Sequence, residues 1–240
     1  MAMAAANEPI WRAEGAEKRR AVQEMFGEIA PTYDLLNSFL SLRLHRSWRR
    51  TVAAMLDLKD GNLALDVCSG TGDFLPELRK LVGDRGTVLG VDFSPEMLER
   101  AAAKYDESLS LGDACQLPVQ GGCIDGVTVG WGLRNVPDVD RALTEIFRVL
   151  KSGGRFVSID MAQPKSALSR KVSSTMFNTI APKLGAIVGK TDAYTYLPKS
   201  TARFMSRENL MASMQKAGFT EVKTKDLCFG NICIHFGRKP

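Results

Sequence analysis

Three aspartates with matching placement are the residues best suited to chemistry. Asp66 lies near the carboxyl end of an apolar run and precedes residues 69–73, which read SGTGD. Asp92 closes the next apolar run, and Asp113 follows a third. If these runs are parallel strands, their carboxyl ends meet at one edge of a sheet, where open α/β sheets bind ligands. The spacing therefore predicts a ligand site that contains several carboxylates.

The loop between the first two acids indicates which ligand would bind. A dinucleotide-binding loop reads G-x-G-x-x-G, whereas Leu75 occupies the position of the third glycine here. Asp66 would also repel a bound pyrophosphate. An adenosyl ligand with a sulfonium, an amino-acid tail and no phosphates suits these charges. Asp66 and the loop would face its cationic end, Asp92 its ribose hydroxyls and Asp113 its adenine edge.

Residues 65–73 resemble the first motif of class I S-adenosylmethionine (SAM) methyltransferases. Gly70 and Gly72 let the backbone approach a ligand closely, because neither carries a Cβ atom. The alternative is a β-α-β turn with solvent-exposed acids, which is less favoured because acids recur at successive strand ends. The expected cofactor is therefore SAM.

Apolar periodicity predicts the elements that must hold these acids. Short apolar runs alternate with stretches whose apolar residues recur at helical spacing. Ser94 before Pro95 predicts a helix start, and Gly153-Gly154 predicts a helix stop. The expected strands span 63–67, 88–91, 108–111, 124–129, 155–160, 221–227 and 231–236. The expected helices span 21–29, 95–105, 138–150 and 206–217, and a further helix begins just after the glycine-rich loop, where apolar residues recur at helical spacing over 74–82. This alternation, ended by a hairpin, predicts a single three-layer α/β domain over residues 1–240.

Two segments lie outside the alternation. Residues 1–60 predict an N-terminal helical cap, in which the charged run 17–20 is interpreted as a solvated helix face. Residues 164–200 mix apolar residues with lysines. A lid over the site is the more economical interpretation of this insertion, and contact with a membrane surface or a dimer interface stays open.

Composition sets broad limits on the function. Hydrophobic residues make up 45% of the 240 residues and the net charge is +5, as in an ordinary globular protein that could approach an anionic surface. The five cysteines form no C-x-x-C pair and have no nearby histidine at zinc-ligand spacing, so we expect no metal site and a cytoplasmic location. No run is long and apolar enough to span a membrane.

Five separate motifs follow one another along the chain: FGEIAPTYDLLN at 26–37, HRSW at 45–48, SGTGD at 69–73, GLRNV at 132–136 and YTYL at 194–197. Together they resemble one family, the ubiquinone/menaquinone biosynthesis C-methyltransferases. The likeness covers roughly residues 22–237. It implies a Rossmann-like fold with a mostly parallel seven-stranded sheet. It also implies methyl transfer from SAM to a ring carbon of a prenylated quinol, with demethylmenaquinol the favoured substrate over other benzoquinols and naphthoquinols.

The resemblance also implies roles for particular residues. Tyr33, Arg134 and Asn135 correspond to the family's substrate-facing polar group. Arg134 would stabilise a developing quinolate by its charge, since its guanidinium is already protonated and cannot act as a base. A water held by these three residues, or His45 or His235, could accept the proton. The cofactor-binding residues, from the motif and the charge argument together, are Asp66, Gly70, Thr71, Gly72, Asp92, Asp113, Ala114 and Gly130.

Three positions depart from the family's pattern. Gly130 stands where a serine is usual, and Met161 replaces a usual aromatic residue. The turn at 229–233, FGNIC, contains fewer glycines than expected. These departures concern the substrate more than the type of reaction.

Two other functions remain open at this stage. The acceptor could be another small apolar molecule, such as a sterol or a polyketide. The chain could also be a noncatalytic nucleotide- or RNA-binding module, although it lacks interleaved basic and aromatic residues. The expected partners are a prenylated quinol, a transient membrane surface and no nucleic acid, and a homodimer is left open.

Overall fold

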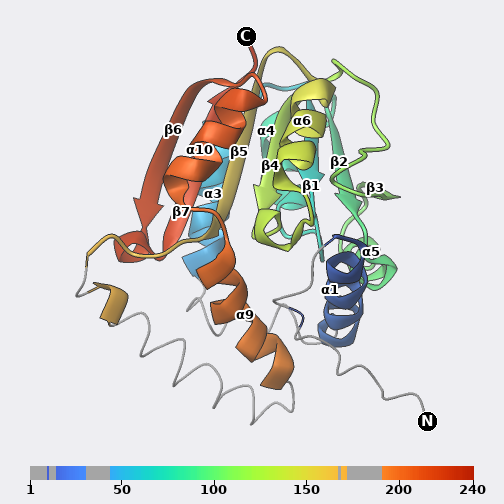
Figure 1. Ribbon diagram of the computed structural model, residues 1–240. Coiled ribbons are helices and arrows are strands. Elements are labelled where there is room, and N and C mark those ends of the chain that lie inside the picture. Colours follow the sequence, from blue (N-terminus) through green and yellow to red (C-terminus); the bar gives the residue numbers. More distant parts are fainter. Residues whose placement is uncertain (1–9, 11–14, 31–43, 167–168, 172–190) are drawn as a thin grey trace.

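The computed structural model describes residues 10, 15–30, 44–166, 169–171 and 191–240. Seven strands form one sheet in the order β3-β2-β1-β4-β5-β7-β6 (Figure 1). The first five strands in this order are parallel, and β7 runs antiparallel to both of its neighbours. The predicted mostly parallel seven-stranded sheet is therefore confirmed. The strands are β1 (Leu63–Val67), β2 (Thr87–Asp92), β3 (Ser108–Leu111), β4 (Ile124–Gly130), β5 (Leu150–Met161), β6 (Thr220–Leu227) and β7 (Ile232–Arg238).

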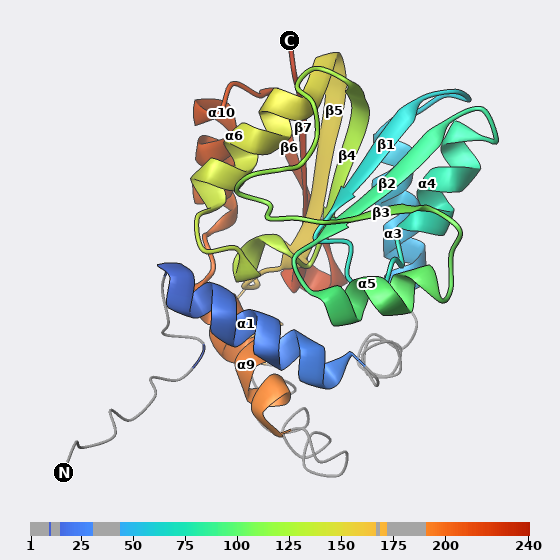
Figure 2. The same ribbon diagram turned by 90° about the vertical axis from the view of Figure 1, so that its right-hand side faces the viewer.

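Helices cover both faces of the sheet and its carboxyl end. α3 and α4 lie on one face, α6 and α10 lie on the other, and α1 crosses the carboxyl end beside α9 (Figure 2). Two short 3-10 turns, η1 and η3, follow β4 and β6. The helices and turns are α1 (Gly15–Ile29), α3 (Leu44–Met55), α4 (Leu75–Val82), α5 (Pro95–Ala102), α6 (Val139–Val149), α9 (Thr191–Arg203), α10 (Arg207–Lys216), η1 (Leu133–Asn135) and η3 (Cys228–Gly230).

The alternation of side chains along β1 produces two cores. Leu65 and Val67 pack in the cluster with α6 and α10, whereas Ala64 packs in the cluster with α3 and α4. All three residues are at most 1% exposed. A parallel sheet buried on both faces needs apolar residues at nearly every strand position, which explains the continuous apolar runs. Asp66 is the polar exception in β1.

Local signals placed most helix ends correctly. The Ser94 hydroxyl accepts a hydrogen bond from the Met97 amide at 3.3 Å, as the predicted N-cap requires. Residue 150 was assigned wrongly. α6 ends at Val149 and Leu150 already belongs to β5, so Gly153-Gly154 lie within that strand and do not stop the helix. Leu150 leaves the helix because its backbone pairs with Ile124 of β4, at a register shift, and its side chain is fully buried there.

Two other helix boundaries also differ. α1 begins at Gly15 rather than residue 21, and α5 ends at Ala102 rather than residue 105. Much of the predicted cap and of the predicted insertion 164–200 lies outside the described residues, so the lid remains a prediction. In the part of the chain that the structure describes, no helix is both long and apolar enough to cross a membrane.

Candidate functional site

A pocket opens at the carboxyl end of the parallel strands, where the sequence placed the acids. Its walls come from the loops after β1, β2, β3 and β4, and from α1, which lies across it. The empty space, including the open mouth, is about 700 Å³.

The structure brings most of the predicted cofactor residues to this pocket and leaves three behind it. The residues on the wall are Gly70, Asp92, Asp113, Ala114 and Gly130. Asp66, Thr71 and Gly72 are not on the wall. A Cβ at Gly72 would meet Leu75 and Tyr105, so this glycine permits close packing of the loop rather than close approach of a ligand.

Asp92 has its carboxylate fixed by the backbone. Its two oxygens accept hydrogen bonds from the amides of Gly70 at 2.8 Å and Ser94 at 2.9 Å. Burial raises the pKa of this carboxyl, while these amides act in the opposite direction by favouring the charged form. Each carboxylate oxygen has a further lone pair, and the residue lies on the pocket wall. Asp92 can therefore accept hydrogen bonds from vicinal hydroxyls of a ligand.

Gly70 supplies the clearest test of fit for an adenosyl cofactor. Its φ of +53° is in the left-handed region, and a Cβ built there would meet no atom within 4 Å. Since Gly70 lies on the wall, that open space belongs to the pocket. A side chain at this position would take up room that a ligand needs, so the residues present fit the cofactor expected from the sequence.

Asp113 is held by its own turn and by α1. One carboxylate oxygen accepts the Cys115 amide at 2.9 Å, and the other forms an ion pair with Arg19 at 2.9 Å. The Asp113 side chain is about one-fifth exposed. Arg19 therefore contacts the acid that the sequence assigned to the adenine edge.

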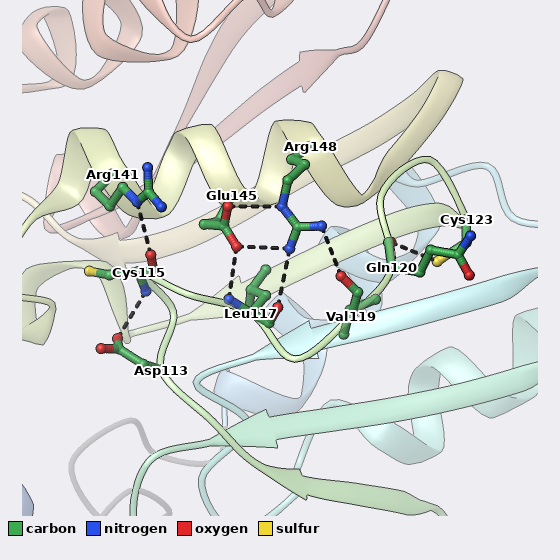
Figure 3. Close-up of polar contacts among 9 residues, drawn as sticks. All are labelled: Asp113, Cys115, Leu117, Val119, Gln120, Cys123, Arg141, Glu145 and Arg148. Atoms are coloured by element: carbon green, nitrogen blue, oxygen red, sulfur yellow. Dashed lines mark hydrogen bonds and ion pairs between the residues drawn. The ribbon is translucent and has the colours of Figure 1, made fainter.

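α6 fixes the loop that carries Asp113 and Ala114 (Figure 3). The buried carboxylate of Glu145 accepts the Leu117 amide at 2.9 Å. Arg148 pairs with Glu145 and donates to the carbonyls of Leu117 and Val119. The hydrogen bond from Arg148 lowers the pKa of Glu145 and keeps it charged. The long loop after β3 thereby acquires a defined shape without regular secondary structure.

Asp66 lies behind the pocket. It is 1% exposed, and it accepts a 2.7 Å hydrogen bond from the Thr128 hydroxyl of neighbouring β4. Burial raises its pKa to about 7. The carboxyl joins two strands, and its predicted contact with the cationic end of a ligand stays a prediction.

The glycine at position 130 has a packing reason. A Cβ there would overlap the ring of Phe74, which is buried at the start of α4. A serine, the residue that the family resemblance led us to expect, would therefore require Phe74 to move. The hydroxyl contact that a serine would supply is replaced here by aromatic packing behind the wall.

The polar turn η1 adjoins the cofactor side of the pocket. Arg134 forms an ion pair with Asp160 of β5, and both side chains are less than 10% exposed. Its guanidinium also donates to the Trp131 carbonyl at 2.8 Å. Arg134 itself is not on the pocket wall, whereas the next residue, Asn135, is. Tyr33 lies outside the described residues.

Asn135 is positioned from two sides. Its amide nitrogen donates to the Trp131 carbonyl at 3.2 Å, and its oxygen accepts the Tyr196 hydroxyl of α9 at 2.9 Å. Burial raises the pKa of Tyr196 to about 12, so this phenol remains a donor at neutral pH. Tyr196 belongs to the YTYL motif, and the structure assigns its side chain the task of orienting Asn135.

α1 contributes residues that the sequence analysis missed. Lys18 donates to the carbonyls of Arg134 at 3.1 Å and Val136 at 2.9 Å, and Arg19 pairs with Asp113. The interpretation of residues 17–20 as a solvated face is therefore wrong for Lys18, which is partly buried, whereas Arg19 is exposed although it pairs with Asp113. The available signal was helical spacing, since Lys18 lies on the same face as the apolar Val22 and Met25.

The two histidines are buried away from the wall. His235 of β7 is 4% exposed, and its Nε2 lies 3.3 Å from the Arg207 carbonyl of α10. Burial lowers the pKa of His235 to about 4. His45 of α3 is 6% exposed and also absent from the wall. These placements weaken both as proton acceptors. In the described ranges, no group of three or more His, Cys, Asp or Glu side chains could hold a metal ion.

We predict that His235→Gln reduces acid destabilisation. The folded pKa of about 4 lies below the ordinary 6.5, so between these values the unfolded chain binds the proton and stability falls as pH falls. Denaturant unfolding at about pH 7 and about pH 4.5 should show a wild-type loss larger by about 2 kcal/mol than the loss of the variant. Asp66 titrates in the opposite sense in both proteins and cancels in the difference. Equal losses would contradict the neutral buried imidazole.

We also predict that Glu145→Ala lowers the free energy of unfolding by about 1–3 kcal/mol, because the Leu117 amide and Arg148 lose a buried acceptor. Asp140→Ala is the matched control on α6, since its ion pair with Lys216 is exposed and worth less than about 1 kcal/mol. Denaturant unfolding measures both variants. Similar losses in the two would show that Glu145 does not hold the loop.

Comparison with solved structures supports the fold. A SAM-dependent methyltransferase of Thermotoga maritima superposes with a TM-score of 0.66 at 23% identity, covering 91% of this chain and 100% of the other. Phosphoethanolamine N-methyltransferase 2 of Haemonchus contortus, in complex with SAM, gives a TM-score of 0.58 at 16% identity, covering 81% and 52%. These likenesses show the class I methyltransferase fold.

Sequence comparison is more specific. The demethylmenaquinone methyltransferase of Desulfitobacterium hafniense is 38% identical over 234 residues, which cover 94% of this chain and 92% of the relative. That of Staphylococcus saprophyticus is 38% identical over 232 residues, covering 95% and 100%. A family model described as the ubiE/COQ5 methyltransferase family matches residues 13–239. The chain therefore belongs to the ubiE/COQ5 methyltransferase family and is a SAM-dependent methyltransferase.

Proposed function

We propose that this protein transfers a methyl group from SAM to a ring carbon of a prenylated quinol, converting demethylmenaquinol to menaquinol. The proposal rests on one observation, namely that two sets of polar residues lie at the same pocket. The strand-end acids Asp92 and Asp113 lie on its wall, and the polar turn with Arg134 and Asn135 adjoins them. The names of the similar proteins supply the quinone.

The cofactor side of the pocket has the groups that an adenosyl ligand needs. Asp92 would accept the ribose hydroxyls, Gly70 leaves room for the ligand, and Asp113 with Ala114 would meet the adenine edge. SAM supplies an electrophilic methyl group on a sulfonium. Arg19 must give up or share Asp113 if the adenine amino group uses the same oxygen.

The substrate side would act on the quinol by charge and position. The ring carbon becomes more nucleophilic as a hydroxyl proton leaves, and it must face the methyl group in line. A new carbon–carbon bond then forms as the sulfur–carbon bond breaks. Arg134, held by Asp160 in the turn beside the pocket wall, would stabilise the developing quinolate by its charge. A water held by Arg134, Asn135 and Tyr33 would take the proton.

The setting of this reaction is part of the proposal. A prenylated substrate partitions into the bilayer, so a cytoplasmic enzyme would contact the membrane surface peripherally, with residues 164–200 as a lid. A homodimer is a further proposal. A sterol or polyketide acceptor is not favoured, because the similar proteins are named for demethylmenaquinone. A noncatalytic RNA-binding role is not favoured, because the chain belongs to a methyltransferase family.

The test of this function is methyl transfer from deuterated SAM to reduced acceptors supplied side by side. These are a short-tailed demethylmenaquinol, a benzoquinol without the ring methyl group, and a sterol. Mass spectrometry should locate the label on a ring carbon of the naphthoquinol. Labelling of the sterol alone, or of no acceptor, would overturn the assignment.

We predict that Asp92→Asn weakens SAM binding by about 1–3 kcal/mol, because a charged acceptor for the ribose hydroxyls is lost. Isothermal titration measures the affinity, and Asp84→Asn, on the loop before β2, is the control. A folded Asp92→Asn protein with wild-type affinity would remove this carboxylate from the cofactor site.

We predict that Arg134→Lys retains SAM affinity but loses more than about 90% of turnover. Lysine keeps the charge but lacks the planar fork that contacts Asp160 and the Trp131 carbonyl together. Arg155→Lys is the matched control and should keep its turnover. Arg155 lies on β5, the strand that carries Asp160, and its ion pair with Asp57 is partly exposed. Near-normal turnover in Arg134→Lys would exclude Arg134 from the reaction.

A further inference from the structure

The turn between β6 and β7 presents an aromatic ring to solvent in an unusual conformation. Phe229 is 90% exposed, the most exposed of the large hydrophobic residues that the structure describes. Phe229 and Cys228 have φ values of +55° and +48°, in the left-handed region that favours glycine. This is the turn in which the sequence analysis expected more glycine. A bulky apolar residue stands here instead, although solvent exposure and a left-handed backbone are both unfavourable for phenylalanine.

The backbone of the turn is fixed from the protein side. The buried guanidinium of Arg207 donates to the Gly230 carbonyl. The Asn231 side chain donates to the Cys228 carbonyl at 3.0 Å, and the Ala162 amide donates to the Asn231 carbonyl at 2.8 Å. Strained conformations persist where surrounding contacts over-determine them, often at functional sites. These contacts hold the ring of Phe229 outward as a fixed projection.

The projection is at the active-site end of the sheet. Ile232, which begins β7, pairs with Met161 at the end of β5, and the preceding residue Asp160 holds Arg134. Figure 1 shows this turn at the end where the parallel strands finish and where α9 ends before α10. A surface that contacted Phe229 would therefore face the substrate side of the site.

Basic residues lie next to the projection. The backbone of Lys165 approaches Gly230, and the Lys165 side chain is 67% exposed. Arg170 and Lys171 follow on an exposed segment. Of the nearby acids, Asp226 pairs with Arg207, and Glu208 lies 3.9 Å from Lys165 in an exposed pair that is weak enough for headgroups to replace. An aromatic ring flanked by cations matches an anionic lipid surface, where the ring enters the interface and the cations meet the headgroups.

We propose that Phe229 inserts into an anionic bilayer surface and docks the active-site end of the protein on the membrane, with Lys165 and Arg170 contacting the headgroups. The reason for docking rests on the proposed function, because a prenylated quinol must reach the pocket from the bilayer. The docking contact itself is a property of this turn and does not require that the substrate be a quinol.

Co-sedimentation with vesicles tests the contact, using phosphatidylcholine with and without phosphatidylglycerol. Phe229→Asn should lower partitioning onto the anionic vesicles about 10-fold. Its melting temperature should equal or exceed that of the wild type, because asparagine tolerates the left-handed conformation. Leu111→Asn is the matched control, since Leu111 is 58% exposed but lies on β3 at the other edge of the sheet. Phe229→Trp should keep the partitioning and shift its emission to the blue on vesicles.

The charge component has its own pair of variants. Lys165→Gln should weaken binding to anionic vesicles and leave binding to neutral vesicles unchanged. Lys59→Gln, on the loop before β1 at the opposite end of the strands, should change neither. Phe229→Asn should slow turnover of a long-tailed quinol in vesicles but not of a soluble, tailless quinol.

Two results would overturn the proposal. One is unchanged vesicle partitioning of Phe229→Asn. The other is that Phe229→Asn lowers the sedimentation mass of the free protein and leaves its binding to vesicles unchanged. This result would identify the turn as a contact between copies of the chain. If no quinol is methylated although vesicle binding follows Phe229, the proposed function fails and the docking inference stands.

Discussion

The buried ion pair between Arg134 and Asp160 is the constraint on which the substrate side depends. Either charge alone, at less than 10% exposure, would be costly, and removing one partner of such a pair costs about 3–5 kcal/mol. The pair fixes η1 against the end of β5. Lys18 then binds the carbonyls of this turn from α1, and Tyr196 binds Asn135 from α9. Segments distant in the sequence thus converge on Arg134, Asn135 and Val136.

The cofactor side is built differently, because backbone amides orient Asp92 and ion pairs support only the position of Asp113 and its loop. Parallel strands that end together place Asp92 and Asp113 at one edge of the sheet, and the Gly70 and Ser94 amides orient the first of these. The network around Glu145 and Arg148 then shapes the loop that carries the second. α1 joins both sides, because Lys18 contacts η1 while Arg19 contacts Asp113.

The sequence could predict the features that depend on local periodicity and strand ends. The sheet, the Ser94 cap and the wall positions of Asp92 and Asp113 follow from such signals. Features that depend on contacts between distant residues could not be predicted. Asp66 has the sequence context of a ligand-binding acid, but Thr128, 62 residues away, binds it inside the sheet. Likewise, the backbone pairing of Leu150 with Ile124 of β4 ends α6 before the two glycines that were expected to stop it.

We propose that Asp160 holds the Arg134 guanidinium for the reaction, so that the pair does more than stabilise the fold. A double-mutant cycle with Asp160→Asn and Arg134→Gln, recording unfolding free energy and turnover together, tests this role. We expect each single variant to be destabilised, the double variant to be destabilised by less than their sum, and all three to have little turnover. Recovery of turnover along with stability in the double variant would contradict it.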